Sequence, residues 1–320
     1  MSERVDVLVI GGGAAGLSGA LALARARRSV LVVDAGEPRN APAAGVHNFL
    51  TRDGTPPAEL IALARAEVAG YGAEVRDGRV TAARRVDGGF EVALADGGTV
   101  RARRLLMAGG ARDELPEVPG LAELWGTDVL HCPYCHGWEV RDEAVGVLAT
   151  SAMGVHHALL WRQWTADLTF FQHTGPEPTA EEAEQFAARG IEVVTGEVVG
   201  LETEGGRLTG VRLAGGAVVP RRALVAQSRV RAPGEALAGL GLEPAEVGMN
   251  GVVFGSVLPV GTDGATAVPG VWVAGNAGDV RAQVVVAAAQ GLAAAGQINM
   301  DLVLEETRAA VAARTAVGAA

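Results

Sequence analysis

Residues 5–34 carry the pattern that most narrows the folds open to this chain. The segment begins with a continuous apolar run rich in β-branched residues, which is typical of a buried parallel strand. Gly11, Gly13 and Gly16 follow it in G-x-G-x-x-G spacing. A helical segment comes next, and then a second apolar run that ends at Asp34. This order predicts a Rossmann-like strand–turn–helix–strand unit that binds a dinucleotide.

Each motif residue has a physical role in such a unit. Gly11 permits the tight turn, Gly13 lets the backbone approach a pyrophosphate, and Gly16 allows the helix to pack closely on the strand. The start of the helix offers free N–H groups to the phosphates. Asp34 is placed to bond a ribose hydroxyl. The motif alone does not distinguish FAD from NAD.

Two later stretches favour FAD. Residues 104–116 read as a strand that ends in a glycine turn at Gly109, and residues 270–299 read as a strand, a turn with Gly275 and Asn276, and a helix of small residues. Both resemble the second and third fingerprints of flavoproteins that bind two dinucleotides. An Asn at position 276 can still bond a hydroxyl of the flavin side chain, so the order of the three motifs predicts FAD.

The segment 131–139, HCPYCHGWE, contains the two cysteines of the chain, Cys132 and Cys135, flanked by His131 and His136. A C-x-x-C-H pattern is typical of haem attachment, of half a zinc site, or of a redox-active dithiol. Each histidine adjoins a cysteine, which fits a zinc tetrahedron poorly, and the chain has no second cysteine pair. Haem attachment requires export, and the N-terminal segment does not resemble a signal peptide. A dithiol is therefore favoured over haem, zinc or two inert buried thiols.

Taken in order, these motifs resemble the low-molecular-weight thioredoxin reductase family over nearly the whole chain. The resemblance implies an α/β fold with two Rossmann-like dinucleotide-binding domains, the second inserted in the first. Residues 1–115 and 234–320 are expected to form the FAD-binding domain, and residues 116–233 an inserted NADPH-domain-like domain that carries C-x-x-C. The predicted FAD contacts are Gly11, Gly13, Ala14, Ala15, Gly16, Asp34, Asn40, His47, Val80, Gly109, Gly275, Asn276, Gln283 and Val284; no metal ligand is predicted.

The resemblance also implies catalytic roles. Cys135 is expected to face the flavin, and Cys132 to attack or resolve the substrate disulfide. His136 occupies the position of the family's acid–base aspartate, and a histidine can take and return a thiol proton near neutral pH. Asn40 and His47 lie in the loop that passes near the flavin by resemblance. The alternatives are a surface position for His136 and His47, and a turn position for Asn40.

The inserted domain departs from the family where NADPH is expected to bind. After the strand predicted at 143–150, the chain has Ala149, Ser151 and Gly154 in place of a glycine loop, and the offset of Gly154 is uncertain. After the next predicted strand, at 166–173, the family's basic cluster is absent. Each charge-assisted bond to a phosphate is worth roughly 1.5–3 kcal/mol. Loss of both the glycine loop and the basic cluster is therefore expected to weaken NADPH binding by several kcal/mol.

Three stretches of the chain, 37–54, 132–142 and 156–164, resemble instead the FAD-dependent dithiol oxidases that close disulfides in natural products such as holomycin and gliotoxin. The first hypothesis is therefore oxidation of a small-molecule dithiol with O2 as acceptor. The alternative is a thioredoxin-reductase-like disulfide reductase that uses NADPH weakly or a redox protein such as ferredoxin as donor. A third hypothesis is a flavin-containing binding or redox-sensing protein without turnover.

Composition limits the other partners. The chain is 49% hydrophobic and 20% charged, with net charge −10 and no basic block, which argues against nucleic acid and anionic membranes. No apolar run reaches the roughly 18 residues of a membrane span. We expect a cytoplasmic homodimer, the dimer by resemblance.

Overall fold

The strand–turn–helix–strand unit is present in the computed structural model, which describes residues 3–249 and 251–318. β1 (Glu3–Ile10) leads into α1 (Ala14–Arg25), and β2 (Val30–Asp34) lies parallel to β1. Alternate residues of β1 enter two different cores: Val7 and Val9 lie in the core shared with α1, while Leu8 and Ile10 lie in the core on the other face. Burial on both faces explains why the run is continuously apolar.

The first sheet joins residues from both ends of the chain. Its strand order is β3-β2-β1-β6-β5-β4, and β19 also pairs with β6. β6 makes this possible because its first half pairs antiparallel with β5 and its second half pairs parallel with β19. The further elements of this part are α2 (Pro57–Gly70), β3 (Glu74–Asp77), β4 (Val80–Val86), β5 (Gly89–Leu94), β6 (Thr99–Met107) and β19 (Val271–Val273).

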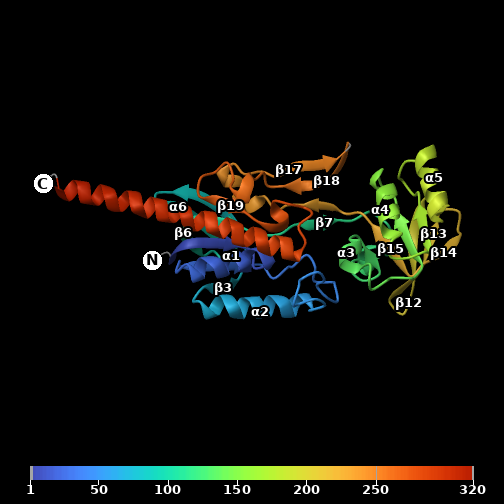
Figure 1. The fold of residues 1–320 in the computed structure, drawn as a ribbon, viewed down its shortest axis with the longest axis horizontal. Coiled ribbons are helices and arrows are strands. Elements are labelled where there is room, and N and C mark those ends of the chain that lie inside the picture. The colour runs from blue at the N-terminus through green and yellow to red at the C-terminus, as the bar shows by residue number, and fades with distance from the viewer. Residues whose placement is uncertain (1–2, 250, 319–320) are drawn as a thin grey trace.

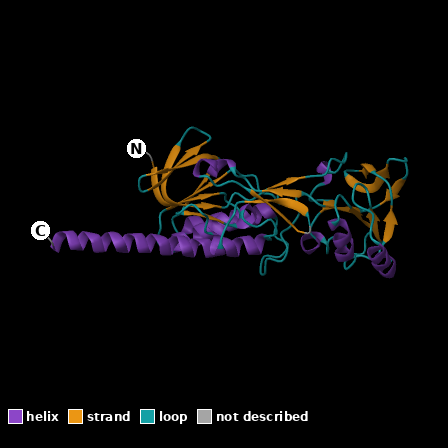
Figure 2. Cartoon of the chain, turned by 90° about the horizontal axis from the view of Figure 1, so that it is seen from above, coloured by secondary structure: helices purple, strands orange, loops and turns teal. Residues whose placement is uncertain are grey.

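The last helix, α6 (Val284–Gly318), packs along α1. The two helices approach closely because Gly291 of α6 lies against the carbonyl of Ala15, where a Cβ would overlap it. The C-terminal half of α6 projects beyond the sheet (Figures 1 and 2). The sequence predicted a helix here, but not its length.

The smaller part of the molecule, on the right in Figure 1, holds a five-stranded parallel sheet in the order β11-β10-β9-β15-β8 and an antiparallel sheet in the order β12-β13-β14. Its strands are β8 (Val129–Leu130), β9 (Val145–Leu148), β10 (Leu168–Phe171), β11 (Glu192–Val194), β12 (Val198–Glu204), β13 (Arg207–Leu213), β14 (Val218–Pro220) and β15 (Ala223–Ala226). Its helices are α3 (Pro133–His136), α4 (Met153–Trp161) and α5 (Ala180–Arg189).

Two antiparallel strands connect the parts, β7 (Arg112–Glu114) on the way out and β16 (Arg229–Arg231) on the way back. They belong to a four-stranded sheet with β17 (Ala245–Met249) and β18 (Val252–Val257). The predicted domain borders, 115/116 and 233/234, lie just beyond these two strands and stay predictions. Short 3-10 helices complete the described chain: η1 (Ala122–Leu124), η2 (Glu235–Leu240), η3 (Thr262–Gly264) and η4 (Gly275–Ala277).

Candidate active site

The first glycine loop leaves an open approach to the start of α1. Gly11 has φ +105°, and a Cβ there would overlap the carbonyl of Ala108, so no other residue fits easily. A Cβ at Gly16 would overlap the carbonyl of Gly11. At Gly13, in contrast, a Cβ would meet no atom within 4 Å. The roles predicted for Gly11 and Gly16 match this geometry, and the space beside Gly13 is free for a ligand.

The first turn of α1 adds the binding groups for that ligand. No side chain caps the helix, whose N-cap is Gly13, and no acidic residue lies in its first turn. The backbone N–H groups of Ala14 and Ala15 are therefore available to an anion at the positive end of the helix. The loop fits the pyrophosphate of FAD.

Asp34 lies at the end of β2 and is held from two sides. Its Oδ1 accepts a bond from Gly12 N (3.0 Å), and its Oδ2 accepts one from Arg65 (2.6 Å). A Cβ at Gly12 would lie 2.8 Å from the Asp34 side chain, a constraint that the sequence analysis did not assign. Gly78 N donates to the Asp34 carbonyl (2.8 Å), which brings Val80, the first residue of β4, near this end of the site.

The other glycines of the predicted site meet the first loop. A Cβ at Gly11 would lie 2.8 Å from Gly109 Cα, and one at Gly275 would lie 3.0 Å from the Cβ of Ala15. These residues lie at the carboxyl ends of β1, β6 and β19, which meet at one edge of the sheet. The structure thus brings together predicted contacts from three separate motifs, at the edge where such sheets bind ligands.

Asn276 is engaged in holding the turn before α6. Its Nδ2 donates to the carbonyls of Asp279 (2.9 Å) and Ala282 (3.0 Å), and its Oδ1 faces Arg39 (3.4 Å). Both N–H bonds are used, so only the oxygen is left for the hydroxyl contact expected from the sequence. Gln283 and Val284 follow this turn at the beginning of α6.

The cysteine pair follows β8. Cys132 is the N-cap of α3 and Cys135 lies within the helix, both partly buried and unbridged. The hydrogen bond with Cys135 lowers the pKa of Cys132, supported by the N–H groups of Cys135 and Tyr134 and opposed by burial. The same bond, together with burial, raises the pKa of Cys135. In the dithiol form Cys132 is therefore the more acidic of the two thiols, which suits it as the group that meets substrate.

His136 ends α3. Its ring lies edge-on to that of His131, with centroids 6.4 Å apart. Burial lowers the pKa of His136; the charge of His47 lowers it further, and that of Glu139 opposes the shift. Burial also lowers the pKa of His131, to about 4. Among residues 3–249 and 251–318, no hydrogen bond joins His136 to either thiol, and the ring is neutral and able to accept a proton at pH 7.

The loop after β2 meets the cysteine segment. His47 lies between Asp53 (Nδ1, 3.4 Å) and Glu139 (Nε2, 3.3 Å), so it contacts the chain just after the C-x-x-C turn. Asn40 lies in a turn, where its backbone carbonyl accepts a hydrogen bond from Ala43 N (3.0 Å). His47 is half-buried, which disfavours the surface alternative, while Asn40 has the turn position that was its alternative.

Arg39 is the main site residue that the sequence analysis missed. Its Nε and Nη2 donate to the two oxygens of Asp113, each at 2.7 Å, and the pair is largely buried. Its positive charge favours the thiolate form of both Cys132 and Cys135. The available signal was its place beside Asn40, in a loop already expected near the flavin.

Neither a metal site nor a membrane helix is found in the part of the chain that the structure describes. No group of three or more His, Cys, Asp or Glu side chains there could hold a metal ion. No helix there is long and apolar enough to cross a membrane.

Comparison with known proteins decides the family. The family model described as pyridine nucleotide-disulphide oxidoreductase matches residues 5–291. The chain belongs to this family. This pyridine nucleotide-disulphide oxidoreductase is of the thioredoxin-reductase-like kind, whose members bind FAD, so the predictions of a flavin-dependent enzyme and of FAD as its cofactor are confirmed.

Similar proteins support the assignment. Thioredoxin reductase tcpT of Claviceps purpurea is 42% identical over 171 residues, which are 52% of this chain and 53% of that protein. Thioredoxin reductase aclD of Aspergillus oryzae is 40% identical over 153 residues, 45% of this chain and 47% of that protein. The chain thus spans about half the length of the curated relatives it matches.

Two solved structures match over much more of the chain. The crystal structure of HlmI has a TM-score of 0.91 and 44% identity, covering 99% of each chain. That of an oxidoreductase from Agrobacterium tumefaciens has a TM-score of 0.88 and 36% identity, covering 94% of this chain and 99% of that one. The predicted fold, α/β with Rossmann-like domains of the thioredoxin reductase type, is confirmed.

Proposed function

We propose that the enzyme oxidises a small-molecule dithiol to a disulfide through Cys132 and Cys135 and passes the electrons to O2 without NADPH. One observation carries the proposal. The phosphate cradle of the first glycine loop is open at Gly13, whereas in the corresponding loop of the inserted part Ser151 carries a side chain that bonds Gln227. The cysteine pair Cys132 and Cys135 is present at the start of the inserted part.

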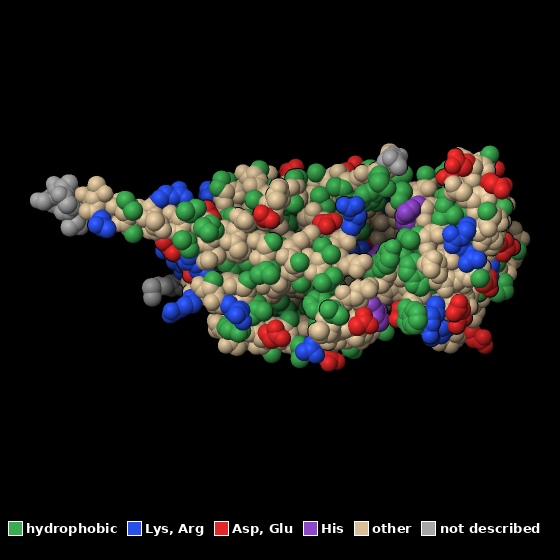
Figure 3. Space-filling view, in the orientation of Figure 1, with side chains coloured by type: hydrophobic (Ala, Val, Ile, Leu, Met, Phe, Trp, Pro, Cys, Tyr) green, Lys and Arg blue, Asp and Glu red, His purple; other side chains and the backbone are tan. Residues whose placement is uncertain are grey.

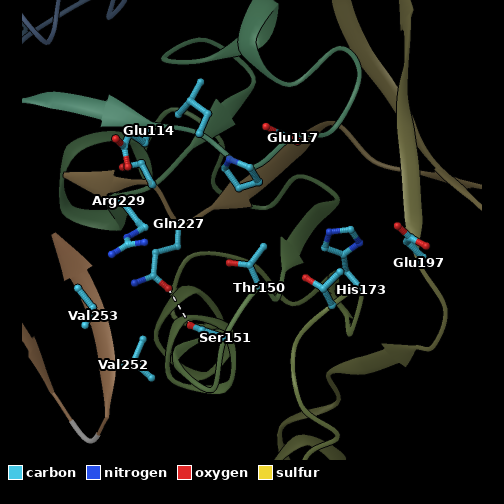
Figure 4. A pocket seen from close by; sticks show the side chains of 14 residues that line it. Glu114, Glu117, Thr150, Ser151, His173, Glu197, Gln227, Arg229, Val252 and Val253 are labelled. Atoms are coloured by element: carbon cyan, nitrogen blue, oxygen red, sulfur yellow. Dashed lines mark hydrogen bonds between the residues drawn. The ribbon is translucent and has the colours of Figure 1, made fainter. Parts of the chain in front are cut away.

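The second loop has the residue spacing of the first, counted from the end of its strand, although its helix begins one residue later, after Ala152. Gly154 lies five residues after Ala149, as Gly16 lies after Gly11, and a Cβ at Gly154 would lie 2.6 Å from the Cβ of Ala149. Ser151 then stands where Gly13 stands in the first loop. Its Oγ bonds Gln227 Oε1 (3.1 Å), which follows β15, so the bond crosses between β9 and β15 (Figure 4). That gap is where the strand order reverses and a dinucleotide pyrophosphate would bind.

The cavity at this edge is also acidic. It has a volume of about 730 Å³, and the carboxylates of Glu114, Glu117 and Glu197 line it together with one guanidinium, that of Arg229 (Figure 4). His173 lies at the end of β10, but its Nδ1 accepts a bond from Val198 N (3.1 Å). Negative charge disfavours the phosphates of NADPH, and no arginine replaces the family's basic cluster after β10.

The cysteine geometry supports entry of electrons from a dithiol. A substrate thiolate attacks Cys132 Sγ in the Cys132–Cys135 disulfide, which breaks that bond, forms a mixed disulfide and releases Cys135 as thiolate. The second substrate thiolate attacks the substrate sulfur of the mixed disulfide, which forms the product disulfide and expels Cys132. The backbone N–H groups of Cys135 and Tyr134, which lower the pKa of Cys132, favour its departure as a thiolate.

Proton and electron transfer complete the reaction. His136, neutral at pH 7, accepts a proton from the substrate thiol. FAD, held by the first glycine loop and the start of α1, would supply the two-electron acceptor that lets Cys132 and Cys135 re-form their disulfide and the route by which two electrons and two protons reach O2 as H2O2. The sum is one dithiol and one O2 converted to one disulfide and one H2O2.

The alternative is a disulfide reductase. The relatives named thioredoxin reductase and the cavity at the NADPH position favour it. Its electrons would come from weakly bound NADPH or from a redox protein such as ferredoxin. We propose that the enzyme acts as a homodimer in the cytoplasm, whether it oxidises dithiols or reduces disulfides.

The test is a product balance in air with dithiothreitol as the dithiol and no nicotinamide. We expect oxidised dithiothreitol and H2O2 in a one-to-one ratio, and neither product above background with Cys132→Ser. Formation of H2O2 only after NADPH is added would reject the oxidase and favour the reductase.

A further inference from the structure

One loop of the FAD part reaches across to the cysteine segment. We call residues 39–55 the cross-loop. It makes three polar contacts outside its own part: Arg39 with the connecting strands, His47 with Glu139, and Asn48 with the backbone of the C-x-x-C turn. Figure 3 shows histidine side chains gathered where the larger and smaller parts meet.

The contact of Arg39 ties the loop to both connecting segments. Arg39 grips both oxygens of Asp113 in β7 at 2.7 Å, and Ser228 Oγ, on the return path just before β16, donates to the same carboxylate at 2.5 Å. Asp113 is thus shared between the outgoing and returning chain. Because a bidentate pair fixes the angle as well as the distance, this contact restricts how the smaller part turns on its two connections.

The contact of Asn48 reaches the cysteines directly. Asn48 Nδ2 donates to the carbonyl of Tyr134 at 2.6 Å, and Tyr134 lies between Cys132 and Cys135. The backbone N–H of Asn48 is itself held by Asp53 Oδ1 at 2.8 Å. The donor is therefore anchored in its own loop before it meets the turn.

The cross-loop is also built rigidly. It is closed by paired backbone bonds, Val46 N to Thr55 O and Gly54 N to Val46 O, both 2.8 Å. Asn48 has φ +60°, which asparagine tolerates, but Thr51 has φ +74°, which strains a β-branched residue. Such strain persists only where the surrounding bonds over-determine the conformation, and it concentrates at functional sites.

We propose that the cross-loop is a clamp that fixes the C-x-x-C turn against the FAD part, with Arg39 and Asn48 as its positioning residues. Arg39 sets the orientation of the smaller part, and Asn48 sets the position of the turn that carries both sulfurs. The clamp acts on the distance between the cysteines and the flavin. It operates whichever way electrons flow, so it does not depend on the oxidase proposal.

The test compares Asn48→Gly and Arg39→Met with a matched control. Glycine accepts the positive φ of position 48 and removes only the side chain, and methionine keeps the stem of Arg39 without its guanidinium. The control is Arg231→Met, which removes an exposed ion pair with Glu114 between the same two connecting strands. The FAD-loaded proteins are reduced with two electrons from dithionite without air, and the thiolate–flavin charge-transfer absorbance is measured.

Both clamp variants should lose about half or more of the charge-transfer absorbance, since that band requires close apposition of sulfur and flavin. Amide hydrogens of residues 131–139 should exchange about tenfold faster, the equivalent of one lost hydrogen bond. FAD content should stay near the wild-type value in both variants, and so should the melting temperature of Asn48→Gly. Arg39→Met leaves the buried carboxylate of Asp113 without its cation and should melt at a lower temperature. Arg231→Met should change neither readout. Arg39→Lys, which keeps the charge but not the two-bond grip, should fall between Arg39→Met and wild type.

Unchanged absorbance and unchanged exchange in Asn48→Gly would overturn the clamp, and this variant decides the matter if Arg39→Met fails to fold. In a protein without a charge-transfer band, exchange at 131–139 alone decides. Neither readout uses a dithiol or O2. Failure of the clamp is thus distinguishable from failure of the oxidase proposal.

Discussion

The loop at residues 10–16 and the loop at residues 148–154 share a spacing between the end of the strand and a packed glycine, and they differ at the position that faces the ligand. In the first, the space beside Gly13 is open; in the second, the hydroxyl of Ser151 bonds Gln227. The turns differ as well, since Gly11 has φ +105°, whereas Ala149 is outside the left-handed region. A Rossmann-like fold can thus keep its helix packing while the position that faces the ligand carries a side chain.

The difference also separates structural from functional glycines. Gly16 and Gly154 occupy equivalent positions, because each lies where a Cβ would crowd the start of its own loop. That requirement comes from packing and does not depend on a ligand. The requirement at Gly13 came from the ligand, and its counterpart, Ser151, is free to carry a side chain.

If the second loop does not bind NADPH, electrons can reach the flavin only through the cysteine pair. Cys135→Ser should lower the rate of flavin reduction by a dithiol by about 10⁴ or more, the scale seen when a catalytic nucleophile is removed. The FAD spectrum of the oxidised protein should remain, because the first loop is untouched. Stopped-flow absorbance without air measures the rate, and reduction at the wild-type rate would mean a route that bypasses the pair.

Loss of the proton acceptor should have the next largest effect. His136→Ala should slow the dithiol reaction by about 10²–10⁴, the usual range for a general acid–base group. The pKa of His136 is lowered by burial, so the wild-type rate should hold through neutral pH and fall only on the acid side, below the ordinary histidine range. The variant should lack that acid limb, and an identical pH profile would place proton transfer at another group.

Matched substitutions at the two loops test the comparison itself. Gly11→Ala should cost about 3 kcal/mol or more of unfolding free energy and reduce FAD content, because of backbone overlap with Ala108 and the positive φ. Ala149→Gly should cost about 1 kcal/mol or less and leave FAD unchanged. Denaturant unfolding and flavin absorbance measure both, and equal losses would show that the loops are not functionally different.

The smallest effect is expected at Ser151. Ser151→Gly removes the bond to Gln227, a loss of about 1 kcal/mol in stability. It restores space for a pyrophosphate but supplies no counter-charge to the acidic cavity. NADPH should therefore remain a weak ligand by equilibrium dialysis. Micromolar binding to this variant would mean that Ser151 alone closes the site.

Local patterns made the two loops and the cysteine turn predictable. The strand, turn and helix of the first loop lie within one stretch, and the glycine spacing reflects contacts a few residues apart. The register of Gly154 could not be read, because without the first two glycines the spacing is undefined. The structure shows this register, because Gly154 in α4 packs directly against Ala149.

Contacts between distant segments were not predictable. Arg39 and Asp113 are 74 residues apart, and Asn48 and Tyr134 are 86 apart, with no periodic signal at either end. The pairing of Asp34 with Arg65 and of Asn276 with its own turn likewise depends on tertiary geometry. The sequence therefore predicts which chemistry is present more readily than how its groups are held.

Anaerobic bleaching of the flavin tests the central claim most directly. Wild-type protein is mixed without air with dithiothreitol in one sample and with NADPH in another, and the loss of flavin absorbance is followed. The filled second loop and the retained cysteines predict rapid bleaching by the dithiol, abolished in Cys135→Ser, and far slower bleaching by NADPH even at millimolar concentration. Rapid, saturable bleaching by micromolar NADPH, with none by the dithiol, would contradict the account and establish a reductase.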